Sequence, residues 1–255
     1  MDIGQRHFEK GKALYRMKRY KEAIDELLNS LTYYPNHEST LDGIIEIYVK
    51  LGDYENALLF ADKLFELNPT NSRVFYIKSF IAHRHNKYDE AETFIKEAIK
   101  LAPNRTENWG TYASICISLN RIEEALNYAE QGLSINPEDR ECLVRKMLAL
   151  GHLKSLKEAQ EVETILLSLY PNDAYIHYSI GWMNLISKQA ENAEASFRQS
   201  LSINPSYINS EKGLAKVTDL KTELKEQKNK DIVVGCLILS VLFLSVLWLI
   251  KWMFF

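Results

Sequence analysis

The sequence has few prolines and cysteines and no excess of basic residues. Its three cysteines, Cys116, Cys142 and Cys236, are odd in number and show no CxxC spacing, which excludes a complete disulfide framework and a zinc site of that type. Lys and Arg number 31 against 34 Asp and Glu, so the formal net charge is −3. Without surplus positive charge, the chain is not expected to bind nucleic acid. Its 46% of hydrophobic and 25% of charged residues exclude a disordered or fibrous chain.

The sequence also lacks the motifs that mark common catalytic and nucleotide-binding sites. It contains no GxGxxG, GxxxxGK[ST], GxSxG or HExxH pattern. His83 and His85 are two residues apart, so on a helix they point to different faces and do not form a metal-binding pair. We therefore predict that the protein is not an enzyme, and that it has no catalytic residues, no cofactor and no metal site.

The six prolines are evenly spaced along the chain. They are Pro35, Pro69, Pro103, Pro137, Pro171 and Pro205, and each follows the previous one by 34 residues. An alanine stands twelve residues before every proline, and a large apolar residue stands four residues before it. A fixed period of this length indicates an internal structural repeat. If each proline is position 32, the six repeats are 4–37, 38–71, 72–105, 106–139, 140–173 and 174–207.

Each repeat carries the pattern of two helices. Apolar residues recur at three- and four-residue spacing on both sides of a short polar break, which in the second repeat is Gly52-Asp53. Proline then ends the second helix because it has no amide hydrogen to donate. The alanine column fits a close crossing of two helices, where a larger side chain would force them apart.

These columns resemble the tetratricopeptide repeat (TPR) family, whose pattern is W-x2-L-G-x2-Y, then A-x3-F, then P over 34 residues. The resemblance covers residues 4–207. It implies an all-α fold, an α-solenoid in which six TPR helix pairs form a right-handed superhelix and the first helices line a concave groove. The fifth repeat departs most from the pattern, because Glu163 stands where the family has a large apolar residue.

The resemblance also implies which side chains face the groove, namely those at positions 2, 5, 6, 9, 12 and 13 of each first helix. Aromatic residues there suggest binding, because a solvent-facing column has no packing reason to be aromatic. The alternative, that some of these rings pack against neighbouring helices, stays open. The candidate partner-binding residues are Phe8, Lys12, Tyr15, Arg16, Arg73, Tyr76, Phe80, Arg84, Arg145, Tyr178 and Trp182.

One known groove chemistry does not fit this sequence. The TPR family that the sequence resembles includes co-chaperones that bind the C-terminal carboxylates of Hsp70 and Hsp90. They do so with lysine, asparagine and arginine side chains at five groove positions. The matching positions here hold Phe8, Lys12, Gly43, Arg73 and Ile77, of which only Arg73 offers comparable chemistry. We therefore do not expect a carboxylate clamp.

The residues after the last repeat divide into a charged segment and an apolar one. Residues 208–230 carry an apolar stripe opposite many Lys and Glu residues, and we expect them to form a capping helix. Residues 232–250 contain no formal charge. At 1.5 Å per residue this stretch would be about 28 Å long, close to a hydrocarbon core of roughly 30 Å. We expect one transmembrane helix there, followed by a short tail at 251–255.

The lysines around the apolar stretch suggest an orientation. Six lysines precede it and Lys251 follows it, which predicts repeats on the cytoplasmic side of a membrane. That membrane would be the inner membrane if the protein is bacterial, or an organelle membrane holding a tail-anchored protein if it is eukaryotic.

The sequence is therefore interpreted as a membrane-anchored TPR scaffold or adaptor. It would bind a protein or peptide partner in its concave groove at the cytoplasmic face, and its C-terminal helix would contact membrane lipid. Two alternatives stay open. One is a self-associating structural component of a membrane complex, with the chain as a homo-oligomer, and the other is a tail-anchored targeting or fission-type factor of an organelle.

Overall fold

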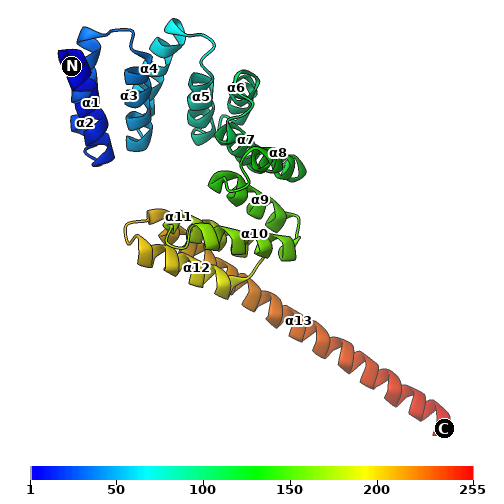
Figure 1. Cartoon of the computed structure of the whole chain (residues 1–255). Helices are drawn as coiled ribbons and strands as arrows, with labels where there is room; N and C mark the ends of the chain where they lie inside the picture. Colours follow the sequence, from blue (N-terminus) through cyan, green and yellow to red (C-terminus); the bar gives the residue numbers. More distant parts are fainter. Residues whose placement is uncertain (1, 255) are drawn as a thin grey trace. The chain divides into compact units, whose positions relative to one another are not determined.

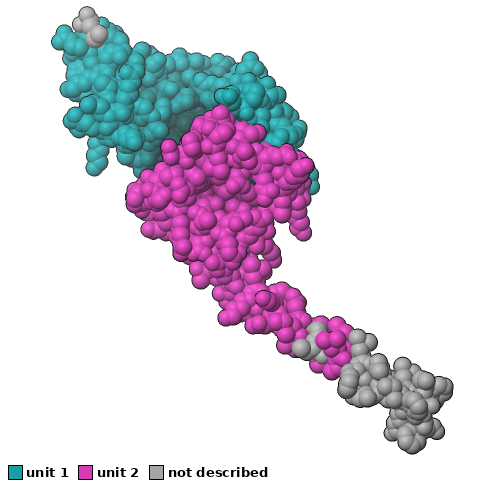
Figure 2. Space-filling model, turned by 60° about the horizontal axis from the view of Figure 1, so that its bottom comes forward, with its two compact units in different colours: residues 1–149 teal, residues 150–255 magenta. Residues whose placement is uncertain are grey.

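The computed structural model describes residues 2–254, without the side chains of residues 235–236 and 241–254. Over that range the secondary structure is entirely helical, in thirteen helices of a TPR-like, all-α solenoid (Figure 1). The chain divides into two compact units, which we call the N-terminal unit (Met1–Ala149) and the C-terminal unit (Leu150–Phe255) (Figure 2). The all-α fold predicted from the sequence is confirmed.

The N-terminal unit is a succession of helix pairs joined by short turns. The first helices of the pairs are α1 (Ile3–Arg16), α3 (Glu38–Leu51), α5 (Ser72–Arg84) and α7 (Thr106–Ser118). The second helices are α2 (Tyr20–Tyr33), α4 (Tyr54–Leu67), α6 (Tyr88–Leu101) and α8 (Ile122–Ile135). Helix α9 (Arg140–His152) begins in this unit and runs past its end. Each second helix ends two residues before a proline, as expected for a residue that cannot continue a helix.

Small residues let the two helices of a pair approach closely. Ala23 is fully buried, and Gly11 faces it from α1. A Cβ added to Gly11 would lie 2.7 Å from Cγ of Leu27 and 3.2 Å from the carbonyl oxygen of Ala23. The alanine column and the glycine opposite it therefore set the helix spacing by leaving no room for a larger side chain.

The turn inside each helix pair contains one residue in the left-handed region of backbone space. These residues are Lys18, Gly52, Asn86, Asn120, Lys154 and Lys188. Their φ angles lie between 57° and 74°, and they are spaced by 34 residues. Glycine adopts this conformation freely, whereas most side chains make it unfavourable by about 1–2 kcal/mol. The repeat geometry therefore imposes the turn even where lysine occupies it.

Helices in contact are close to one another in the sequence. Among the described residues, each contact between helices joins neighbours along the chain, as in α1 with α2, or next neighbours, as in α1 with α3. This pattern is typical of repeat proteins, in which each repeat is buried only against the adjacent ones.

A polar cluster joins α6 to the middle of α7 and to the turn that follows α7. Glu92 of α6 accepts hydrogen bonds from the Tyr112 hydroxyl and from Arg121 Nη2, both at 2.8 Å, and pairs with Lys96 Nζ at 2.7 Å. Burial of the Glu92 carboxyl opposes ionisation and raises its pKa. The bonds from Lys96, Tyr112 and Arg121 outweigh that effect and lower the pKa to about 2 from an ordinary 4.5.

Replacing Glu92 with glutamine is expected to lower the free energy of unfolding by about 2–3 kcal/mol at neutral pH, because the amide is a weaker acceptor for the same donors. A carboxyl with a lowered pKa stabilises the fold above its unfolded pKa near 4.5 and loses that effect as the pH falls towards 2. In urea unfolding, the difference between the two proteins should shrink from about pH 5 to about pH 2.5. A difference that stays constant over this range would contradict the assigned role of Glu92.

The C-terminal unit contains the end of α9 and four further helices. These are α10 (Leu156–Leu169), α11 (Ala174–Ile186), α12 (Ala190–Ile203) and α13 (Ile208–Phe254). Phe197 of α12 is fully buried, and Val217 and Leu220 of α13 pack in the same cluster. The beginning of α13 therefore covers the last helix pair.

Helix α13 runs without a break through the predicted capping segment and into the predicted membrane-spanning one. In the part of the chain whose side chains are described, no helix combines the length and the apolar character needed to cross a membrane. Within the predicted span, the described apolar residues lie at 232–234 and 237–239, after a charged segment that ends at Asp231, and they form too short a stretch.

This finding contradicts the prediction of a single-pass membrane protein whose TPR domain faces the cytoplasm. The predicted anchor and its contact with lipid have no support from the described residues. The remainder of the predicted span at 232–250, together with the tail at 251–255, lies outside the described side chains.

Candidate binding groove

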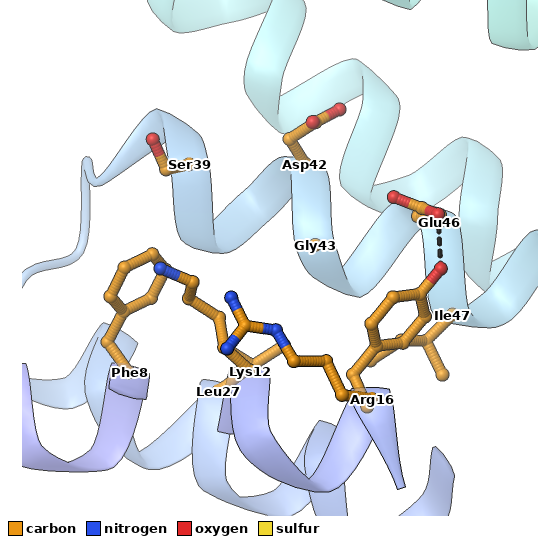
Figure 3. Close-up of a pocket in the computed structure, with 10 residues that line it drawn as sticks. Phe8, Lys12, Arg16, Leu27, Ser39, Asp42, Gly43, Glu46 and Ile47 are labelled. Carbon is orange, nitrogen blue, oxygen red and sulfur yellow. Dashed lines mark hydrogen bonds between the residues drawn. The ribbon is translucent and has the colours of Figure 1, made fainter. Parts of the chain in front are cut away.

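A pocket of about 510 Å³ lies between α1, α2 and α3 in the N-terminal unit (Figure 3). Its lining residues are Phe8, Lys12, Tyr15 and Arg16 of α1, Leu27 of α2, and Ser39, Asp42, Gly43, Glu46 and Ile47 of α3. The four α1 residues are all predicted groove residues. Their spacing of three and four places them on one face of the helix, and the structure brings them together at one site.

The floor of the pocket is apolar and contains a glycine. Leu27 and Ile47 are buried beneath it. A Cβ added to Gly43 would meet only Leu27 Cδ1, at an ordinary contact distance of 3.4 Å. The ring of Phe8 packs edge-on against His37 with 4.9 Å between ring centroids. The absence of a side chain at Gly43 therefore contributes to the open space above the floor.

The α1 side of the pocket is positively charged. Lys12 Nζ lies 4.9 Å from the centroid of the Phe8 ring and 3.4 Å from Glu9 Oε2. Arg16 is exposed, and no hydrogen bond or ion pair joins it to another described side chain. In Figure 3 both basic side chains extend from α1 across the space below α3.

The α3 side carries two carboxylates that accept hydrogen bonds from other side chains of the protein. Arg73 of α5 donates to Asp42 through Nε and to Glu46 through Nη2, the latter at 3.4 Å. The Tyr15 hydroxyl donates to Glu46, as the dashed line in Figure 3 shows. Burial raises the pKa of Asp42 although Arg73 opposes it, and burial with the Glu46 bond raises the pKa of Tyr15. Arg73 therefore holds these carboxylates in place.

Two predicted aromatic residues of α5 have packing contacts. Tyr76 and Phe80 are partly buried against the hydrophobic core of the N-terminal unit. Phe80 lies edge-on to Tyr54 with 6.4 Å between ring centroids, and burial raises the pKa of Tyr76. Packing therefore accounts for part of each ring's surface, and a direct role of these rings in binding stays a prediction.

Two further predicted residues lie near His83. Arg84 is exposed at the end of α5. Arg145 lies on α9, and its Nη2 atom is 3.1 Å from Oε2 of Glu141. Burial lowers the pKa of His83, and the charges of Arg145 and Arg84 lower it further, to about 4. The two arginines thus place positive charge close to His83, which is neutral at physiological pH.

The last two predicted residues belong to the C-terminal unit. Tyr178 and Trp182 pack against Phe197, with ring centroids 6.0 and 6.2 Å from it. Leu214 of α13 lies in the same cluster. These two rings therefore help to cover the last repeat, and they are not part of the pocket on α1 and α3.

The candidate binding residues chosen from the sequence omit several residues of the pocket. Ser39, Asp42, Gly43 and Glu46 occupy positions 2, 5, 6 and 9 of the second repeat, so the groove register places them in the groove, but they were not selected as binding residues. The groove register could not select Leu27, because that register covers only the first helix of each pair and Leu27 lies on a second helix.

Two observations concern metal binding and thiol chemistry among the described residues. No cluster of three or more His, Cys, Asp or Glu among them is arranged to hold a metal ion. Cys116 and Cys142 are buried, and burial raises the pKa of both thiols, to about 11 for Cys116. Thiols in that state carry almost no reactive thiolate at neutral pH.

Two family models match parts of the chain. One, described as anaphase-promoting complex, cyclosome, subunit 3, matches residues 47–132, and the other, described as tetratricopeptide repeat, matches residues 174–207. Neither description is that of an enzyme.

Relatives and solved structures agree with these matches. Hsp70-Hsp90 organizing protein 1 of Glycine max is 27% identical over 131 residues, which cover 51% of this chain and 22% of the relative. This chain thus matches only about a fifth of that relative's length. The APC/C hetero-tetramer Cut9-Hcn1 structure gives a TM-score of 0.72 at 16% identity, covering 84% of this chain and 42% of that chain. A tetratricopeptide repeat protein from Parabacteroides merdae gives 0.68 at 16% identity, covering 83% of each chain.

Proposed function

Because the chain is a tetratricopeptide repeat protein, we propose that it is a scaffold that holds a segment of a protein partner in the groove between α1 and α3. The observation that carries this proposal is the pocket of about 510 Å³ on that groove. Pockets of this size, with an apolar floor and a few convergent polar groups, are typical of specific binding sites.

The side chains of the pocket indicate the chemistry of the bound segment. Leu27, Gly43 and Ile47 form a floor for one bulky apolar side chain. Asp42 and Glu46 are already engaged by Arg73, whereas Arg16 has no ionic partner among the described residues. We therefore propose a segment that carries an apolar residue close to an acidic one, with the acidic residue paired to Arg16.

The names of the similar proteins support a protein as the partner. The soybean relative is named as an organizing protein for Hsp70 and Hsp90, and the Cut9-Hcn1 structure is a hetero-tetramer of the APC/C. In this chain Arg73, the one side chain comparable to those of a carboxylate clamp, is already bound to Asp42 and Glu46, so it is not available to hold a C-terminal carboxylate. We therefore propose an internal segment of the partner and not its C-terminus.

Photo-crosslinking from Ser39 tests this proposal. Ser39 is exposed on the pocket rim, so p-benzoylphenylalanine placed there in the full chain should label a bound segment. We expect one dominant adduct in the cells that make the protein, and mass spectrometry of the crosslinked peptide should find an apolar residue next to an acidic one.

Ser134 provides the matched control, because it is an exposed serine near the end of α8 and away from the pocket. Labelling from Ser39 should exceed labelling from Ser134 by at least about tenfold, as expected for a specific pocket. Equal labelling from both positions would contradict binding at this pocket, and a crosslinked C-terminal peptide would contradict the internal segment.

A further inference from the structure

Two packing columns of the repeats each contain one conspicuous polar residue. The column at position 24 holds Leu27, Ala61, Ile95, Ala129, Glu163 and Phe197, and all of these except Glu163 are at most 2% exposed. The column at position 11 holds Leu14, Tyr48, Ala82, Cys116, Leu150 and Asn184. In each column, five of the six residues pack as apolar or aromatic groups. Glu163 and Asn184 are therefore exceptions to the packing rule of their own repeats.

The two exceptions meet at one place. Glu163 and Asn184 both line a pocket of about 400 Å³ formed by α10, α11 and α12 of the C-terminal unit. The other lining residues are Gln160, Thr164, Gln189, Asn192, Ala195 and Ser196. Ala195 is the only apolar residue of the described lining. Polar substitutions in two separate columns have thus produced one polar pocket.

Neither exception is compensated by a partner within the described chain. Asn184 is 4% exposed, and its side chain makes no hydrogen bond to another described residue. Glu163 is half-buried and has no hydrogen bond or ion pair with a described side chain, and burial raises its pKa although His177 opposes this. Neither residue has a fully buried side-chain atom without a partner, so the polar atoms of both are open to the pocket. Two polar side chains that replace apolar ones and open to one pocket without a protein partner are available to a ligand.

The pocket wall is rich in hydrogen-bond acceptors. The hydroxyls of Thr164 and Ser196 donate to carbonyl oxygens of their own helices, at 2.9 Å each. Asn192 Nδ2 donates to Gln189 Oε1 at 2.8 Å. The two hydroxyl donors are occupied, so the lone pairs of the hydroxyls and of the Glu163 carboxylate remain for a ligand that donates. The amides of Gln160 and Asn184 can turn their oxygens towards the same ligand.

The single carboxylate limits the kind of cation. A divalent metal ion needs several anionic or neutral oxygens in a tight shell, and the described residues hold no cluster of acidic or other metal-binding side chains here. A guanidinium group carries one charge and five N–H donors in a plane, which suits one carboxylate surrounded by separate acceptors. An ammonium group has its three donors on one nitrogen atom, so it would reach fewer of these acceptors at the same time.

We propose that this pocket binds a guanidinium group, with Glu163 as its counter-ion and Asn184 as a buried acceptor. The group belongs either to an arginine in a peptide or to a small guanidine compound. The site lies in the C-terminal unit and does not depend on the groove proposed above.

The proposal is tested by titrating the full chain, labelled with ¹⁵N, with acetyl-Gly-Arg-Gly-amide. We expect the side-chain amide signals of Asn184 to shift and saturate. The same peptide with citrulline, which has the shape of arginine without its charge, should bind at least about tenfold more weakly. Equal binding of the citrulline or the lysine peptide would overturn the guanidinium assignment, and so would the absence of any shift. Methylguanidine, a free guanidine without a second charge, decides the source: binding as tight as that of the peptide identifies a small molecule, and weaker binding identifies an arginine of a peptide.

Substitutions at Glu163 separate binding from packing. Glu163→Gln keeps the shape of the side chain and should weaken binding of the arginine peptide at least about tenfold, whereas Glu161→Gln, on the exposed face of α10, should leave it unchanged. Glu163→Leu restores the apolar column, so it should abolish binding while raising Tm by about 3 °C. A lower Tm for Glu163→Leu would show that Glu163 serves the fold, and would overturn the proposal.

Discussion

Replacing Gly43 with methionine is expected to reduce affinity for the partner segment at least about fiftyfold without unfolding the protein. The methionine side chain would occupy the space above Leu27 and Ile47, where the apolar residue of the partner is proposed to bind. The backbone tolerates the change because a Cβ at this position meets only Leu27 Cδ1, at 3.4 Å. The position is inside α3, so the change should also add about 1 kcal/mol of helix stability.

The measurement is the Kd for the segment identified by crosslinking from Ser39, determined by fluorescence anisotropy with the full chain. Gly43→Ala is the matched control, because it adds the same helix stability but leaves most of the pocket open. It should reduce affinity by less than about fivefold. An unchanged Kd for the methionine variant would place the binding site elsewhere on the protein.

Replacing Phe197 with alanine is expected to destabilise the C-terminal unit by about 3–5 kcal/mol. The ring is fully buried and lies between two glycines on the helices beside it. A Cβ added to Gly181 of α11 or Gly213 of α13 would lie 2.6 or 2.5 Å from Cε1 of the ring. The removal of the ring therefore leaves a cavity at the point where three helices meet, and Tyr178 and Trp182 lose the surface against which they pack.

Hydrogen exchange followed by mass spectrometry measures this effect in each unit separately. Protection of residues 174–222 should fall sharply, while protection of residues 3–135 should change little, because those helices do not contain the cavity. Phe197→Leu should cost less, at about 1–2 kcal/mol, since it refills part of the space. A loss below about 1 kcal/mol for the alanine variant would show that the cluster contributes little to the unit.

The helices were predictable because their signals lie within single repeats. Proline ends each second helix through its own chemistry, and the alanine column reports a close approach between two helices of one pair. The left-handed turn could be predicted at Gly52, Asn86 and Asn120, because glycine and asparagine adopt that conformation most readily. At Lys18 and Lys188 the residue type gives no indication, because packing on both sides of the turn imposes the conformation.

The groove was only partly predictable because it depends on contacts between repeats. The spacing on α1 selected Phe8, Lys12, Tyr15 and Arg16, which lie together at the pocket. Arg73 was selected for its charge, but its partners Asp42 and Glu46 lie on the preceding repeat and engage it within the protein. A list of positions that face a groove does not show which charges compensate one another.

Two aromatic residues of the last helix pair were selected for the groove although they have packing contacts. Tyr178 and Trp182 occupy groove positions, yet they pack beside Phe197 and Leu214 because α13 covers the end of the repeats. The prediction of a cytoplasm-facing membrane protein was wrong for a different reason. It rested on the length and the lack of charge of residues 232–250, most of whose side chains lie outside the described residues, and no helix within the described residues is long and apolar enough to cross a membrane.

The restriction of helix contacts to near neighbours has a consequence for the rate of folding. Contacts between residues close in sequence need only short loops to close, and proteins dominated by such contacts fold fast for their size. The pair α1–α2 can therefore form while later repeats are still being synthesised, and each new pair can dock on the one before it. Folding during synthesis can then grow pair by pair from the N-terminus, because the apolar surface of each pair is covered by a near neighbour and not by a distant segment.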